Sequence, residues 1–168
     1  MTASPSTTNP TAAGDPWNLQ RFLDAQAGVY DVALDELHAG QKRSHWMWFI
    51  FPQLTGLGRS ETSRFFGISG LDEARAYLAH PVLGPRLVAC CRAAIDAGVD
   101  AESLVGFPDC LKLRSCATLF AAVSPPGSPF HALLERLYAG RADPETLRLL
   151  GLTAATPPAR PDLTPGPT

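Results

Sequence analysis

Charged residues are scarce in this chain, and it contains no apolar segment of membrane-spanning length. Asp, Glu, Lys and Arg make up 18% of the 168 residues, and the formal net charge is −2. A slightly acidic chain has no general attraction for nucleic acid, so no nucleic-acid partner is expected. The longest apolar run, Trp46 to Phe51, is much shorter than the roughly 20 residues that cross a bilayer, so we expect no membrane-spanning helix.

Export and metal signals are absent as well. Residues 1–14 lack the positively charged and apolar segments of a signal peptide. The four cysteines, Cys90, Cys91, Cys110 and Cys116, show neither C-x-x-C spacing nor a histidine pairing typical of zinc sites. We therefore expect a soluble, cytoplasmic protein with reduced, buried thiols and with no metal or cofactor.

Strand-like alternation is also missing, and no internal repeat is present. Apolar residues instead recur at helical spacing between glycines and prolines. This pattern predicts an all-α, compact single domain over residues 15–151, built as a bundle of about eight short helices. Residues 1–14 and 152–168 are rich in Pro, Ser, Thr and Ala, and we expect both to be disordered tails.

Several residues are of the types that begin helices, because their side-chain oxygens accept hydrogen bonds from first-turn amides. In three cases a proline follows directly, which is common in the first turn. The predicted caps are Asp15, Ser44, Ser60, Asp100, Ser128 and Asp143.

The densest group of large apolar side chains lies between Arg43 and Gln53. Residues 46–51 are apolar on every side, which is typical of a segment that is buried on every side. If residues 45–51 are helical, His45, Trp48 and Phe49 share one face. Two interpretations stay open: the polar residues around this aromatic block are satisfied core groups, or they line a ligand pocket.

In the pocket interpretation, the indole rings of Trp46 and Trp48 stack on a ligand ring. Arg43, His45 and Gln53 are then the polar contacts of that ligand. Concave sites of this kind combine apolar walls with a few polar groups that fix orientation.

Residues 110–123 form a second unusual segment, predicted as a central helix because so few of its residues are charged. Arg114, Ser115 and Thr118 share one half of its helical wheel, and Lys112 lies beside Leu119. A planar guanidinium beside two hydroxyls suits a phosphate or another anion. The alternatives are that these cations extend to the surface or form structural ion pairs.

The chain contains five distinctive motifs: His45–Gln53, Gly58–Ser60, Phe66–Ile68, Glu73–Gly84 and Leu111–Ser115. Together they resemble a mainly bacterial family catalogued as domain-of-unknown-function family 1810. The resemblance extends from about Asp15 to Gly151 and implies a compact, mostly α-helical fold without a known activity. Some members are labelled calpastatin, but that inhibitor is a disordered repeat protein, whereas this chain has no repeat.

These observations favour a binding module for a small anionic or nucleotide-like ligand. In that hypothesis cations hold a phosphate or carboxylate, an indole stacks on a ring, and two polar side chains set the orientation. The predicted ligand-binding residues are Arg43, Trp46, Trp48, Gln53, Lys112, Arg114 and Ser115.

Two alternatives remain from other functional classes. The first is an enzyme acting on a nucleotide-like substrate, with His45 as general acid or base and Cys110 or Cys116 as a less favoured nucleophile. The second is a protein-interaction module without a ligand pocket. A monomer or weak homodimer is expected in each case.

Overall fold

Residues 14–152, the part of the chain that the computed structural model describes, form ten α-helices and no β-strand. The helices are α2 (Gln20–Gln26), α3 (Tyr30–His38), α4 (Met47–Ile50), α5 (Glu61–Phe65), α6 (Leu71–Ala79), α7 (Leu83–Asp96), α8 (Ala101–Val105), α9 (Asp109–Ala121), α10 (Pro129–Tyr138) and α11 (Pro144–Leu150). The predicted all-α single domain is therefore confirmed, with ten helices instead of eight. The tails predicted at residues 1–14 and 152–168 lie outside this range except for Gly14 and Leu152.

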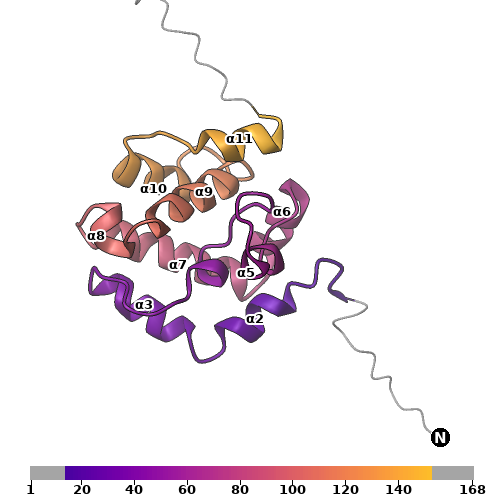
Figure 1. Cartoon of the computed structure of the whole chain (residues 1–168), viewed down its shortest axis with the longest axis horizontal. Coiled ribbons are helices and arrows are strands. Elements are labelled where there is room, and N and C mark those ends of the chain that lie inside the picture. The colour runs from indigo at the N-terminus through magenta and orange to yellow at the C-terminus, as the bar shows by residue number, and fades with distance from the viewer. Residues whose placement is uncertain (1–13, 153–168) are drawn as a thin grey trace, which may run out of the picture.

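Helix α9 lies near the centre of the fold, as its sparse charge predicts (Figure 1). It packs against α10, α8, α11, α6 and α4, and the long helix α7 packs against α3, α6 and α10. From Ser115 to Ala121 every residue of α9 is buried. The side chains of α9 that reach the surface therefore belong to its first turns, before Ser115.

Four of the predicted caps begin helices as expected. Each side chain accepts a hydrogen bond from a first-turn amide, and in α10 and α11 a proline follows directly. These caps are Ser60, Asp100, Ser128 and Asp143. Asp15 acts at a distance, because its carboxylate accepts from the amides of Leu19 and Gln20 although α2 begins only at Gln20.

The predicted cap at Ser44 is wrong. Its hydroxyl donates to Glu36 at 2.7 Å, and α4 begins only at Met47. His45 therefore precedes the helix and does not share a helical face with Trp48. The Ser44 side chain is directed toward Glu36, and the helix begins three residues further on, with Trp46 at its N-cap and no side-chain cap hydrogen bond.

The aromatic block is core, as the unbroken apolar run predicts. Trp46, Met47, Ile50 and Phe51 are each at most 2% exposed, while Trp48 is half-buried. Helix α4 packs against α2 and α9, so the block lies between the N-terminal helices and the central helix. Burial of large aromatic side chains is among the largest single contributions to a small core.

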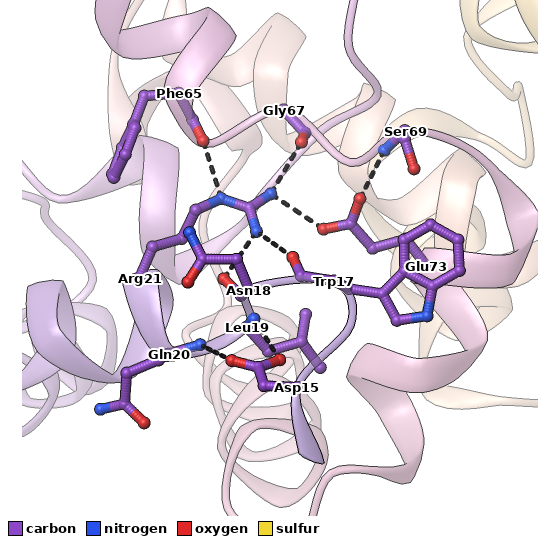
Figure 2. A network of polar contacts seen from close by, with 10 residues as sticks. All are labelled: Asp15, Trp17, Asn18, Leu19, Gln20, Arg21, Phe65, Gly67, Ser69 and Glu73. Atoms are coloured by element: carbon purple, nitrogen blue, oxygen red, sulfur yellow. Dashed lines mark hydrogen bonds and ion pairs between the residues drawn. The ribbon is translucent and has the colours of Figure 1, made fainter. Parts of the chain in front are cut away.

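A polar anchor, centred on Arg21, joins α2 to the segment between α5 and α6 (Figure 2). All five N–H donors of the Arg21 guanidinium are used. They donate to the carbonyl oxygens of Trp17, Asn18, Phe65 and Gly67 and to the Glu73 carboxylate, at 2.7–2.9 Å.

The Glu73 carboxylate links this anchor to the start of α6. Its other oxygen accepts from the Ser69 amide at 2.9 Å (Figure 2). Just before Ser69, a Cβ added at Gly67 would lie 2.2 Å from Thr55 Oγ1 and 2.9 Å from its Cα. Only glycine therefore allows this close approach, next to the Leu54–Ile68 bridge.

No helix in the described range is both long and apolar enough to cross a membrane. All four cysteines are buried and free, as expected. Burial raises the pKa of Cys116 and also that of Cys110. Because the thiolate is the nucleophilic form, neither environment favours a reactive cysteine.

Candidate functional site

Helix α9 presents side chains to two separate surface cavities whose lining residues do not overlap. One cavity, of about 310 Å³, brings together Gln53, Lys112 and Ser115, three of the predicted ligand-binding residues. We call it the Gln53 cavity. The other, of about 330 Å³, contains Arg114. We call it the Arg114 cavity.

Arg114 points toward the loop that follows α10. Its Nε donates to the Arg141 carbonyl and its Nη2 to the Ala142 carbonyl, each at 2.8 Å. The rest of the cavity lining consists of Leu137, Tyr138, Ala139 and Arg141. Two arginines thus share one concave surface, and no carboxylate of residues 14–152 belongs to its lining.

The positive charges of this cavity are not neutralised by ion pairs. Within residues 14–152, neither Arg114 nor Arg141 lies within 4.0 Å of an acidic oxygen. The Glu135 carboxylate lies against Gly140, the residue before Arg141. Hydrogen bonds to backbone carbonyls therefore hold Arg114 in place, as they hold a structural arginine. Its positive charge has no ion-pair partner within residues 14–152, which is typical of an arginine that binds an anion.

The Arg141–Asp143 loop is held by three side chains from about one turn of α9, those of Arg114, Ser115 and Thr118. Beside the two bonds from Arg114, Thr118 Oγ1 accepts from the Asp143 amide at 2.8 Å and donates to the Arg114 carbonyl at 2.9 Å. Ser115 Oγ lies 3.2 Å from Asp143 Oδ2. The hydroxyls of Ser115 and Thr118 therefore fix this loop and do not join Arg114 in one anion site.

Lys112, Asp109 and Lys42 form a cluster of charges beside the indole rings of Trp46 and Trp48. Its Nζ lies 3.3 Å from Asp109 Oδ1 and 4.2 Å from the centre of the Trp48 ring. Lys42 Nζ lies 2.9 Å from the other Asp109 oxygen and 5.3 Å from the Trp46 ring. One carboxylate thus faces two ammonium groups, and cation–π contacts with the indoles stabilise the remaining positive charge.

Glu36 holds the start of the aromatic block. Its carboxylate accepts from the amides of Arg43 and Ser44, from the Ser44 hydroxyl and from Trp46 Nε1, at 2.7–3.0 Å. Desolvation raises the pKa of Glu36, but these four hydrogen bonds outweigh it and lower the pKa to about 2. The charged form of Glu36 is therefore part of the folded structure.

The remaining predicted site residues lie apart from both cavities. Trp46 is 0% exposed and its indole N–H is used by Glu36, so its ring is not accessible to a ligand. Arg43 and His45 are exposed. No carboxylate within the described part of the chain bonds His45, so nothing in the structure supports its role as general acid or base, and that role stays a prediction.

Sequence reasoning did not place Arg141, Asp143 or Glu145 in a candidate site. Arg141 and Asp143 lie in a short loop that approaches α9 only through folding, and Asp143 was predicted only as a helix cap. Glu36 was missed for the same reason, because its four donors lie seven to ten residues further along the chain.

Comparisons with known proteins give a family but no activity. The model of the family described as "Protein of unknown function (DUF1810)" matches residues 16–150. The chain is also similar to the crystal structure of the conserved hypothetical protein Rv1873 from Mycobacterium tuberculosis, with 49% sequence identity and a TM-score of 0.80. That match covers 83% of this chain and 100% of the other. A comparison with curated proteins finds no match.

Proposed function

Because the chain belongs to the DUF1810 family of proteins of unknown function, we propose a function from its own geometry: it is a binding module for a small anionic ligand. The ligand occupies the Arg114 cavity. The observation that carries this proposal is the presence of Arg114 and Arg141 in one cavity lining that contains no carboxylate.

The guanidinium of Arg114 is positioned in advance for such a ligand. An arginine has five N–H donors, and within residues 14–152 only Nε and Nη2 of Arg114 are bonded to protein acceptors. The two N–H groups of Nη1 therefore remain for a ligand. Because the bonds to Arg141 and Ala142 already hold the side chain, binding costs little additional side-chain entropy.

The cavity indicates the size and shape of the ligand. Guanidinium groups bind phosphate and carboxylate through parallel hydrogen bonds. Leu137, Ala139 and the Tyr138 ring supply an apolar wall for an uncharged part of the molecule. A volume of about 330 Å³ is at the small end of ligand pockets, which are roughly 300–1,000 Å³, so a monophosphate or small carboxylate fits better than a dinucleotide.

Replacing Arg141 tests this function with little risk to the fold. Its side chain is exposed and makes no hydrogen bond with the described residues, so we expect Arg141→Gln to leave the free energy of unfolding nearly unchanged. Losing one charged contact costs about 1.5–3 kcal/mol, so affinity should fall at least about tenfold. Isothermal titration calorimetry with inorganic phosphate, phenyl phosphate and AMP measures this change.

Arg136→Gln is the matched control. Arg136 is an exposed arginine of α10 that does not line the cavity, so the variant removes the same charge from the same helix region. We expect it to bind the probes as the unchanged protein does. Equal losses in both variants would indicate a general charge effect, and the absence of binding to all three probes would contradict the proposed anion site.

A further inference from the structure

The Gln53 cavity is built from three segments that are far apart in the sequence. Gln53, Leu57 and Gly58 come from the connection between α4 and α5, and Lys112 and Ser115 come from α9. The start of α11 completes the lining with Asp143 and Glu145, and Pro108 and Leu111 form the remaining wall. None of these residues lines the Arg114 cavity.

Opposite charges line this cavity without pairing to each other. Lys112 is bonded to Asp109, at 3.3 Å, and no ion pair within 4.0 Å joins it to Asp143 or Glu145. Glu145 is instead paired with Arg148. A separated cation and anion in one small cavity can each interact with a complementary group of a single ligand.

Two polar side chains of the lining, Asp143 and Gln53, retain bonding capacity. Asp143 Oδ2 accepts from the Thr146 amide and hydroxyl, at 2.9 Å and 2.6 Å, and lies near Ser115 Oγ. Oδ1 of the same carboxylate accepts no hydrogen bond from the residues that the structure describes. The side-chain amide of Gln53 likewise makes no hydrogen bond with residues 14–152, although the backbone carbonyl of Gln53 accepts from the Ile68 amide.

The other wall of the cavity is apolar. Leu57, Pro108 and Leu111 form this part of the lining. Leu111 is 49% exposed although it lies on the central helix. Phe107, next to this wall in the sequence, is 70% exposed. A ligand with an apolar substituent would cover part of this surface and gain the corresponding burial energy.

We infer that the Gln53 cavity is a second ligand site, for a small zwitterion that carries an ammonium group, a carboxylate group and an apolar substituent. The carboxylate meets Lys112 and the side-chain amide of Gln53, the ammonium group meets Asp143 Oδ1, and the substituent lies against Leu57 and Leu111. A purely anionic ligand is disfavoured by the two carboxylates, and a purely cationic one by Lys112.

Three probes that share an isobutyl group test this ligand class. L-leucine carries both charges, 4-methylpentanoate lacks the ammonium group, and 3-methylbutylamine lacks the carboxylate. We expect leucine to bind on the order of tenfold more tightly than either analogue, in calorimetric titrations at one pH and ionic strength. Equal affinity for the three compounds, or no binding of leucine, would overturn the inference.

Substitutions then place the ligand in this cavity. We expect Lys112→Gln and Gln53→Ala each to weaken leucine binding several-fold, with Arg136→Gln as the charge-matched control for Lys112→Gln. Arg141→Gln should leave leucine binding unchanged, because it lies in the other cavity. Leucine binding that survives in both cavity variants would contradict the assignment, whereas failure of the phosphate probes alone would affect only the Arg114 cavity.

Discussion

We expect Arg21→Ala to lower the free energy of unfolding by about 3–5 kcal/mol, the usual cost of removing one partner of a buried ion pair. The Arg21 and Glu73 side chains are only 9% and 4% exposed, so the variant leaves a carboxylate buried without its cation. It also leaves four backbone carbonyls without their donor. Urea unfolding followed by circular dichroism measures the loss.

The Arg75–Asp72 pair is the control for this prediction. Its side chains are 56% and 80% exposed, so Arg75→Ala should cost no more than about 0–1 kcal/mol. Arg21→Lys provides an intermediate case, because an ammonium group keeps the charge but offers three donors instead of five. An Arg21→Ala variant as stable as Arg75→Ala would show that the network contributes little.

The second large effect is expected at Glu36. Glu36→Gln should lower the free energy of unfolding by about 2–3 kcal/mol at neutral pH, because it weakens several hydrogen bonds to a charged acceptor. An amide keeps one acceptor oxygen and places an NH₂ group against the donors of Arg43, Ser44 and Trp46. Asp35→Asn, on the exposed side of the same helix, is the control and should change stability little.

The effect at Glu36 should depend on pH with a definite sign. Folding lowers the pKa of this carboxyl from 4.5 to about 2, so the folded state favours the charged form. The stabilisation is complete above about pH 4.5 and is lost as the pH falls toward 2. The stability difference between the unchanged protein and Glu36→Gln should therefore shrink across this interval, and a constant difference would contradict the assigned hydrogen bonds.

Much of the fold could be predicted because its signals are local. Ser60, Asp100 and Ser128 each bond an amide only two or three residues away, so residue type and neighbouring sequence suffice. Ser44 has the same residue type, but its hydroxyl points to Glu36, eight residues upstream, and α4 begins only at Met47. The cap rule failed where a contact with another helix sets the direction of the side chain.

The candidate site was predicted in part. Gln53, Lys112 and Ser115 do line one cavity, but the sequence hypothesis placed Arg114 with them. Residues two positions apart on a helix do not face each other, so Lys112 and Arg114 point to different surfaces. The spacing of Lys112 and Arg114 was visible in the sequence. The position of Arg141 in the Arg114 cavity was not, because Arg141 lies 27 residues from Arg114.

The sequence by itself determined the all-α class, the buried aromatic block, the central position of α9 and the family. These properties depend on periodicity, composition and motifs, which act over a few residues or over the whole chain at once. Only the tertiary structure decided which polar groups meet. Arg21 reaches Glu73 across 52 positions and Ser115 reaches Asp143 across 28, and such pairings depend on how helices pack, which no local pattern encodes.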